Sequence, residues 1–214
     1  MAEHGHDQQQ VGDQQIWDER YRSAPAIWSG HPNTQLVAEA ADLPPGRALD
    51  AGAGEGADAL WLAEHGWRVT AVDLSQVALD RAAAEAARRG LADRVRCVQA
   101  DLGAWEPPVA AFDLVSAQFL HPTAAVRDAL YARLAAAVAP GGTLLLVGHD
   151  VGDLRSGLRR PHGGDRYVGA EVLAGALDPA QWEVLVAEAR PRTAVHDGEE
   201  HQVADAVLRA RRRD

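Results

Sequence analysis

The feature that most constrains the fold is a regular alternation of short apolar runs with longer amphipathic runs between Arg47 and Val147. The short runs have the length of buried strands, and the longer runs have the period of helices. Strands that alternate with helices are joined by right-handed crossovers, which place helices on both faces of a parallel sheet. The alternation therefore predicts an α/β fold with a doubly wound sheet.

This stretch is expected to hold five strands and three helices. The strands are expected at Arg47–Asp50, Arg68–Asp73, Val95–Ala100, Phe112–Ala117 and Thr143–Val147. The helices are expected at about 57–65, 75–89 and 124–138. Ser75 is a candidate N-cap and Gly90 a candidate stop for the second helix. Pro140-Gly141-Gly142 is expected to end the third helix and to begin the fifth strand.

The two ends of the chain depart from the alternation. Residues 1–12 are polar and are expected to be disordered, and helices at 13–21 and 33–41 would form a helical lid within 13–42. After a helix at 170–177, the runs Trp182–Ala189 and Val203–Arg209 flank Asp197-Gly198, a strong hairpin signal. We expect these runs to pair antiparallel at one side of the sheet. The prediction is one Rossmann-like domain over 13–214 with a seven-stranded sheet.

Composition excludes several classes of protein. The 214 residues carry a formal charge of −10, and all 21 basic residues are arginine, which excludes chemistry that needs a lysine amine. The acidic balance disfavours a nucleic-acid partner. Cys97 is the single cysteine, so no internal disulfide is possible, and no apolar run reaches the roughly 18 residues that span a bilayer. We expect a cytoplasmic protein without a membrane partner, and its oligomeric state stays open.

A glycine-rich turn joins the first strand to the first helix of the alternating stretch. It reads Asp50-Ala51-Gly52-Ala53-Gly54-Glu55-Gly56. Glycine lets the backbone approach a ligand closely, and the N–H groups at the start of the helix favour polar or negative groups. Taken alone, the run also fits the dinucleotide pattern G-x-G-x-x-A and turns that hold no ligand.

Acidic residues follow the next two strands. Asp73 closes the second strand about 20 residues after Gly52, where a carboxylate can accept both hydroxyls of a ribose. Asp101 follows the third strand in Gln99-Ala100-Asp101-Leu102, where a polar contact beside an apolar wall suits the edge of a base. Open α/β sheets bind ligands at the carboxyl ends of their strands, so these side chains indicate a ligand at this edge.

The combined motif series resembles that of class I S-adenosylmethionine-dependent methyltransferases over about residues 15–210. The series comprises Asp50-x-Gly52-x-Gly54-x-Gly56, Val72-Asp73-Leu74-Ser75, Ala100-Asp101-Leu102, Phe112-Asp113-Leu114-Val115 and Pro140-Gly141-Gly142-Thr143. The resemblance implies S-adenosylmethionine as cofactor. Its methionine part would contact Asp50, Gly52, Ala53, Gly54 and Gly56, its ribose Asp73, its adenine Asp101 and Leu102, and its amino group the region of Gln118, with Leu74 as a further cofactor contact. A nicotinamide-dependent enzyme is the minor alternative.

A narrower resemblance concerns the N-terminal segment. Trp17-Asp18-Glu19-Arg20-Tyr21, together with Trp28, is similar to the small thiopurine- and tellurite-resistance-type methyltransferases. This resemblance implies that Trp17, Tyr21 and Trp28 cover the cofactor. It also implies a small soft nucleophile as methyl acceptor, such as a thiol or a chalcogen species, although no substrate-reading motif is shared.

The substrate side offers three histidines and a cationic loop. His31, His121 and His149 are the imidazoles expected nearest the transferred methyl group. A base is needed only where the acceptor carries a proton, so a His149 or His121 base defines the alternative of an O- or N-methyltransferase of a specialised metabolite. The candidate substrate loop follows the fifth strand and contains Asp150, Arg155, Arg159, Arg160, His162 and Arg166.

The cationic groups of this loop would receive an anionic small-molecule substrate, and a solvated loop is the competing interpretation. No metal site is predicted, because the spacing of the histidines matches no ligand motif. A cofactor-binding module without catalysis is the remaining alternative from a different functional class.

Overall fold

The computed structural model of the chain describes residues 14–155, 164–196 and 199–214. Within them lies a seven-stranded sheet in the order β3-β2-β1-β4-β5-β7-β6. The strands are β1 (Arg47–Ala51), β2 (Arg68–Asp73), β3 (Val95–Gln99), β4 (Phe112–Gln118), β5 (Val138–His149), β6 (Trp182–His196) and β7 (Glu199–Arg212). The first five strands pair in parallel, and β7 pairs antiparallel with both β5 and β6. The predicted fold class is confirmed.

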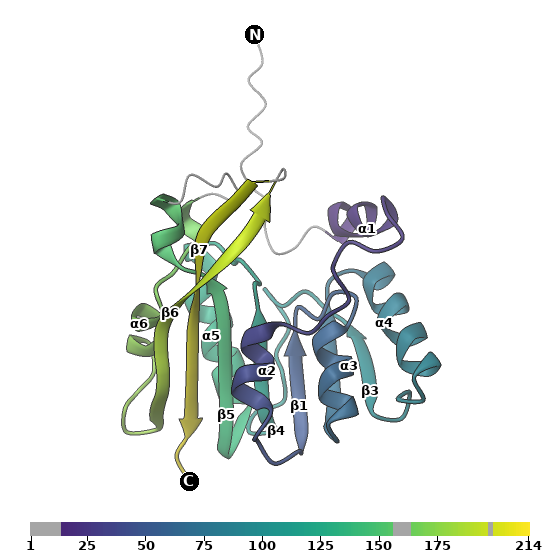
Figure 1. Cartoon of the computed structure of the whole chain (residues 1–214). Coiled ribbons are helices and arrows are strands. Elements are labelled where there is room, and N and C mark those ends of the chain that lie inside the picture. Colours follow the sequence, from purple (N-terminus) through teal and green to yellow (C-terminus); the bar gives the residue numbers. More distant parts are fainter. Residues whose placement is uncertain (1–13, 156–163, 197–198) are drawn as a thin grey trace.

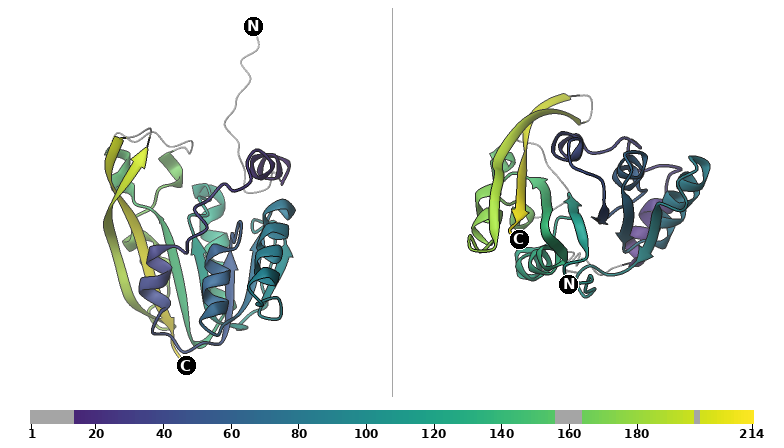
Figure 2. Two further views of the ribbon diagram at one scale, coloured as in Figure 1. Left: turned by 45° about the vertical axis from the view of Figure 1, so that its right-hand side comes forward. Right: turned by 90° about the horizontal axis from the view of Figure 1, so that it is seen from below.

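Helices cover both faces of this sheet (Figures 1 and 2). One face carries α2 (Thr34–Ala40), α3 (Ala57–Glu64) and α4 (Gln76–Arg88), and the other carries α5 (Ala124–Ala137) and α6 (Ala170–Gly175). The short helices η1 (Val151–Arg155) and η2 (Gly164–Arg166) follow β5. The helix α1 (Gln14–Arg22) lies at the end of the molecule where the parallel strands finish, and it packs on α4.

The strand β5 shows how the sheet separates two apolar cores. Leu144 and Leu146 belong to the core that includes Leu130 of α5, whereas Leu145 and Val147 belong to the core that includes Leu36 of α2. Successive side chains of a strand point to opposite faces, so a continuous apolar run fills both cores. The near-uniform apolar character of this run is therefore a consequence of burial on both faces.

Predicted helix boundaries are confirmed at α4 and corrected at β5. The Ser75 hydroxyl accepts a hydrogen bond from the Ala78 N–H at 3.2 Å, and Gly90 has φ +71° just beyond the helix. Pro140-Gly141-Gly142, however, lies within β5 and does not start it. The register against β4 shifts there: Phe112 lies opposite Val138, but Leu114 lies opposite Thr143. Proline has no N–H for the ladder, so this triplet forms an irregularity inside the strand.

The C-terminal strands are longer than the predicted runs Trp182–Ala189 and Val203–Arg209. Pairing of β7 with β5 ends at Asp205 opposite His149, while β6 and β7 continue to pair as far as His196 opposite Glu199. The hairpin therefore rises beyond the edge of the sheet (Figure 1). Its outer part is polar, so the apolar pattern that predicts strands does not reveal it.

Some expectations fall outside the described residues, namely the disordered segment 1–12 and the turn Asp197-Gly198. In the described ranges, no helix has the length and apolarity needed to cross a membrane.

Candidate functional site

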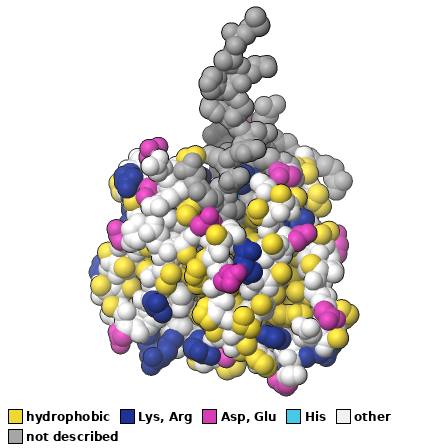
Figure 3. All heavy atoms as spheres, turned by 180° about the vertical axis from the view of Figure 1, so that it is seen from behind, with side chains coloured by type: hydrophobic (Ala, Val, Ile, Leu, Met, Phe, Trp, Pro, Cys, Tyr) yellow, Lys and Arg dark blue, Asp and Glu magenta, His cyan; other side chains and the backbone are white. Residues whose placement is uncertain are grey.

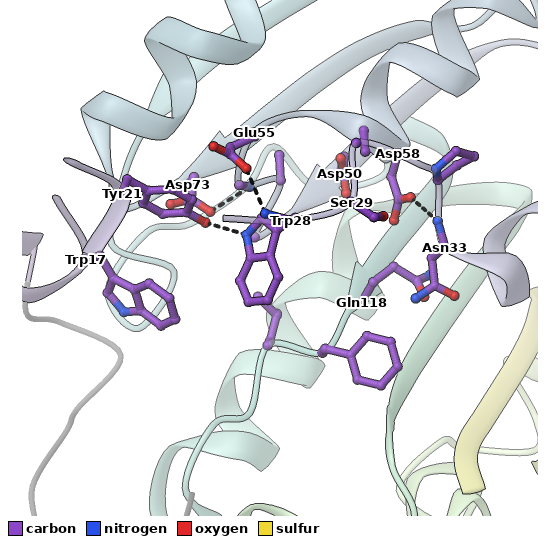
Figure 4. Close-up of a pocket in the computed structure, with 18 of the residues that line it drawn as sticks. Trp17, Tyr21, Trp28, Ser29, Asn33, Asp50, Glu55, Asp58, Asp73 and Gln118 are labelled. Carbon is purple, nitrogen blue, oxygen red and sulfur yellow. Dashed lines mark hydrogen bonds between the residues drawn. The ribbon is translucent and has the colours of Figure 1, made fainter. Parts of the chain in front are cut away.

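A cavity of about 960 Å³ opens at the carboxyl ends of the parallel strands, and Figure 4 shows part of its lining. Most residues singled out from the sequence line it: Trp17, Tyr21, Trp28, His31, Asp50, Gly52, Ala53, Gly54, Asp73, Leu74, Leu102, Gln118, His121, His149 and Arg166. The described lining does not include Gly56, Asp101 or Asp150. Arg159, Arg160 and His162 lie outside the described residues, as does the side chain of Arg155.

The glycine turn gives the cavity its floor. Gly52 and Gly54 have φ +78° and +53°, a backbone region that side chains rarely adopt. A Cβ atom on Gly52 would collide with Leu120, and one on Gly54 would lie 2.9 Å from the Tyr21 hydroxyl. The missing side chains therefore leave space between the turn and its neighbours. Gly56 serves helix packing, because a Cβ atom there would lie 2.6 Å from that of Ala82.

Two predicted carboxylates stabilise their own turns. Asp101 Oδ1 accepts the Gly103 N–H at 2.8 Å, and Asp150 Oδ1 accepts the Gly152 N–H at 2.7 Å. Such bonds two residues along the chain are typical of aspartate in turns. The apolar neighbour Leu102 is the residue of the Asp101 motif that reaches the cavity, together with Ala100.

Three aspartates line one part of the cavity, which we call the carboxylate end: Asp50, Asp58 and Asp73 (Figure 4). Burial raises the pKa of Asp50 well above its usual range, and the charges of Asp58 and Asp73 raise it further. Burial also raises the pKa of Asp58 to about 6 and raises the pKa of Asp73. Clustered carboxylates out of water favour a cation as their partner.

Hydrogen bonds fix Asp58 and Asp73 and leave one oxygen of Asp50 available. Asp58 Oδ1 accepts the backbone N–H of Asn33 at 2.6 Å. Asp73 accepts the Gly54 N–H at 2.8 Å and the Ser75 N–H at 2.9 Å. By contrast, the buried Asp50 Oδ2 has no hydrogen-bond partner among the described residues, and the same is true of the buried Gln118 Oε1. Buried polar atoms normally have partners, so these two oxygens indicate a ligand that donates hydrogen bonds.

The segment from α1 to Trp28 forms one wall of the cavity, and hydrogen bonds and an ion pair attach it to the neighbouring elements. The Ser75 hydroxyl donates to Asp18 Oδ1 at 2.6 Å. Arg81 pairs with Glu55 at 2.6 Å and donates to the carbonyl of Tyr21 at 2.7 Å. Glu55 in turn accepts the Trp28 N–H at 3.1 Å. Helix α4 and the glycine turn therefore fix this wall in place.

Aromatic rings complete the same wall. The Trp28 indole N–H donates to the Tyr21 hydroxyl at 3.1 Å, and the Arg20 guanidinium lies 5.2 Å from the ring centres of both Trp17 and Trp28. Burial and the charge of Asp73 raise the pKa of Tyr21 to about 12. Tyr21 therefore stays a neutral phenol beside the carboxylates.

A cluster of rings lines the other part of the cavity, which we call the imidazole end: Phe119, His121 and His149. The rings of His121 and His149 stack at 4.6 Å with 19° between their planes, and Phe119 lies 4.8 Å from His149. The ring centre of Tyr167 lies 5.9 Å from that of His149. His149 is 7% exposed. His121 after β4 and His149 at the end of β5, both predicted from the sequence, therefore lie in contact. His31 also lines the cavity, but it is exposed.

The loop that carries these rings is strained. Phe119 and His121 both have φ +51°, which is uncommon for residues other than glycine. Arg166 braces the loop by donating to the His121 carbonyl at 2.9 Å. Strain that surrounding contacts maintain is typical of functional sites, so the conformation of this loop supports a role for its side chains.

Sequence reasoning missed several lining residues, namely Asn33, Glu55, Asp58, Phe119 and Arg192. Asp58 could have been predicted from the sequence, because an acidic residue in the first turn of a helix after a glycine loop faces the ligand that the loop binds. Arg192 could not have been predicted in this way, because it lies on the part of β6 beyond the sheet, where no apolar pattern marks a strand.

Comparisons with known proteins agree with the geometry. Residues 48–142 match a family described as a methyltransferase domain. An uncharacterized methyltransferase of Mycobacterium bovis is 40% identical over 111 residues, which make up 51% of this chain and 54% of that protein. The chain thus matches about half the length of this curated relative.

Two solved structures resemble almost the whole chain. One comes from work on the conversion of a disulfide bond into a thioacetal group during echinomycin biosynthesis; it has 25% identity and a TM-score of 0.71, and the alignment covers 94% of this chain and 91% of that one. The other is the 1,6-didemethyltoxoflavin-N1-methyltransferase of Burkholderia thailandensis with bound 1,6-didemethyltoxoflavin and S-adenosylhomocysteine. It has 25% identity and a TM-score of 0.65, with 94% and 87% of the chains covered.

The family match spans the glycine turn, Asp73 and the strand β4, which are the elements that build the carboxylate end. The structural matches extend the likeness to the N-terminal wall and the C-terminal hairpin. Residues 48–142 therefore resemble a methyltransferase domain, in agreement with the motif series, and the chain is similar over most of its length to a methyltransferase whose structure holds S-adenosylhomocysteine.

Proposed function

We propose that this protein transfers the methyl group of S-adenosylmethionine to a small-molecule nucleophile bound against His121 and His149. The observation that carries the proposal is that a single cavity joins the carboxylate end to the imidazole end. Its volume of about 960 Å³ lies at the upper end of the range for ligand pockets, which leaves room for a cofactor and a small acceptor.

The residues at the carboxylate end fit the cofactor. S-adenosylmethionine supplies a methyl group activated by a sulfonium, and its other positive charge is an ammonium. The unpartnered Asp50 Oδ2 and Gln118 Oε1 would accept hydrogen bonds from the ammonium, and Asp50 and Asp58 would balance the positive charge. Asp73 has lone pairs left for ribose hydroxyls, and Leu102 offers an apolar surface to adenine.

The segment from Trp17 to Trp28 would then act as a lid. Methyl transfer is an in-line displacement, so the protein mainly aligns the acceptor and excludes water. Trp17, Tyr21 and Trp28 supply apolar surface over the carboxylate end, and the bonds of Asp18 and Arg81 hold them there. These residues align and shield the reactants without taking part in proton transfer.

The imidazole end favours an acceptor that must lose a proton, an oxygen or a nitrogen. One imidazole of the pair would take this proton as the acceptor atom forms its bond to the methyl carbon. The stacked rings lie 4.6 Å apart, so a positive charge on one disfavours a second charge on the other. The pair would therefore accept a single proton per turnover, with Phe119 keeping water away.

A thiol or chalcogen acceptor is the second candidate. It is supported by the N-terminal motif Trp17-Asp18-Glu19-Arg20-Tyr21 and by the likeness to the structure from the echinomycin study, which concerns the conversion of a disulfide bond into a thioacetal group. A thiol ionises near pH 8.5, so it depends less on a base than a phenol does.

Calorimetry with S-adenosylhomocysteine and NAD tests the cofactor assignment. We expect binding of the first and none of the second; binding of NAD alone would contradict the proposal. Methyl transfer is then measured with labelled S-adenosylmethionine against phenol, aniline, thiophenol and tellurite. Turnover of the phenol or the aniline supports the histidine base, and turnover of the thiol or tellurite alone supports the second candidate. Cofactor binding without any turnover of small acceptors would favour a non-catalytic module.

A further inference from the structure

Arg192 occupies an unusual position in the cavity. It lies on β6 beyond the point where β7 stops pairing with β5, and it lines the cavity together with Arg166 and the histidines of the imidazole end. On the outer face covered by α5 and α6, basic and acidic side chains are interspersed among apolar ones (Figure 3). Inside the cavity, Arg166 and Arg192 accompany the histidines, whereas Asp50, Asp58 and Asp73 form the carboxylate end, whose wall also carries Arg20.

A buried carboxylate fixes the orientation of Arg192. Its Nε lies 2.8 and 3.0 Å from the two oxygens of Asp205, which is 2% exposed. The Gln35 side-chain amide donates to the same carboxylate at 3.3 Å. An arginine held through Nε by a buried partner loses much of the freedom of its long side chain, so the entropy of fixing it is already spent before a ligand binds.

The support for Asp205 extends into α2. Gln35 Oε1 accepts a hydrogen bond from Arg190 at 3.0 Å, and Arg190 pairs with Glu39, which is 8% exposed. The same helix is capped by Asn33, whose N–H binds Asp58 at the carboxylate end. Helix α2 thus connects the hairpin to the cofactor side of the cavity and holds Arg192 at a defined place relative to it.

The outer edge of the guanidinium remains available. In the part of the chain that the structure describes, all hydrogen bonds of Arg192 run through Nε to Asp205. The two terminal nitrogens form a planar pair of donors that matches the two oxygens of a carboxylate. With a cationic cofactor at the carboxylate end, the guanidinium beside the imidazole end is left to bind a negatively charged group.

We propose that Arg192 is a specificity-determining residue that binds a carboxylate group of the methyl acceptor, with Asp205 as its positioning residue. The proposal rests on the proposed function, because it assumes that the acceptor enters at the imidazole end. The acceptor is therefore a small carboxylic acid that also carries the nucleophilic atom. The pre-oriented guanidinium and its place in the same cavity as the two histidines support this substrate class.

The test uses benzoate and its neutral analogue benzamide as probes of the full chain saturated with S-adenosylhomocysteine. Calorimetry should show at least about tenfold tighter binding of benzoate, a difference of about 1.4 kcal/mol. Arg192→Gln should remove this preference while leaving benzamide and S-adenosylhomocysteine binding within about twofold. Arg211→Gln, which changes an exposed arginine of the same hairpin outside the cavity, is the matched control and should keep the preference.

A second variant keeps the test decisive if Arg192→Gln fails to fold. Arg192→Lys preserves the positive charge beside Asp205 but lacks the planar fork, so benzoate should bind several-fold more weakly than to the unchanged protein. Equal binding of benzoate and benzamide by the unchanged protein, or a preference that survives both substitutions, would overturn the proposal. Failure to bind S-adenosylhomocysteine would instead contradict the proposed function.

Discussion

The two ends of the cavity are built in different ways. The carboxylate end comes from short segments, residues 50–58 and 73–75, and backbone hydrogen bonds orient each of its three carboxylates. The imidazole end combines the loop after β4, the end of β5, η2 and the outer part of β6, and side chains orient one another there. The comparison shows that local backbone geometry orients the side chains of the carboxylate end. At the imidazole end, side chains from distant parts of the sequence orient one another.

The largest effect is expected from His149→Gln. Loss of a positioned base lowers kcat/KM for a protonated acceptor by about 10²- to 10⁴-fold, because the proton then has no acceptor at the reacting atom. The affinity for S-adenosylhomocysteine should stay unchanged, since His149 lies at the other end. Turnover measured against the His65→Gln control, which alters an exposed histidine just after α3, checks this separation of the two ends. A matching loss of cofactor affinity would break the comparison.

Asp73→Ala should have the next largest effect. Removal of a charged acceptor of hydrogen bonds weakens cofactor binding by roughly 1.5 to 3 kcal/mol, or about 10- to 150-fold. Calorimetry with S-adenosylhomocysteine measures it, and Asp80→Ala on the exposed side of α4 serves as control. Asp73→Asn, which keeps an acceptor for the Gly54 N–H, separates ligand binding from support of the glycine turn. Unaltered affinity in both variants of Asp73 would refute its assignment to the ribose.

The carboxylate end should also respond to pH in two opposite ways. The pKa of Asp58 is about 6 in the folded protein and near 4 when unfolded, so the folded state binds this proton more tightly. The free energy of unfolding without cofactor should therefore fall as the pH rises from about 4 to 6, by about 2 kcal/mol. Affinity for the cationic cofactor should rise over the same range, because the carboxylate becomes charged.

The variant Asp58→Asn should flatten both dependences and keep an acceptor for the Asn33 N–H. Thermal unfolding without cofactor and calorimetry with S-adenosylmethionine at pH 5 and 8 measure them. Parallel, rather than opposite, changes of stability and affinity would show that Asp58 does not face the cofactor.

The smallest expected effect concerns the lid. Asp18→Ala removes the bond from the Ser75 hydroxyl that fastens α1 to α4, worth about 1 kcal/mol. Cofactor affinity should fall a few-fold, with turnover at saturating cofactor retained. Glu19→Ala, at an exposed position of the same helix, should leave affinity unchanged. If the two variants behave alike, the contact of α1 with α4 does not support the cofactor.

Much of the carboxylate end was predictable from the sequence because its determinants are local. Glycines at positive φ and carboxylates at strand ends follow from the spacing of Gly52, Gly54 and Asp73 alone. Asp101 shows the limit of this reasoning, since an aspartate can bind its own turn and leave its neighbours Ala100 and Leu102 in the cavity. The sequence predicts that Asp101 lies at the carboxyl edge of the sheet, but it does not predict the direction in which the side chain points.

The imidazole end was predictable only in part. His121 and His149 follow neighbouring strands of the sheet, so their proximity was a fair expectation, but their stacking depends on the strained backbone at Phe119 and His121. The position of Arg192 depends on how far the polar hairpin of β6 and β7 extends past the sheet. The pairing between these two strands determines this length, and no apolar pattern in the sequence reveals it.

The most direct test is a crystal structure of the full chain with S-adenosylhomocysteine. We expect its amino group against Asp50 and Gln118, its ribose against Asp73, and its sulfur facing the stacked rings of His121 and His149 across open space for an acceptor. A bound cofactor whose sulfur points away from these rings, or whose amino group lies at the imidazole end, would contradict the assignment of the two ends.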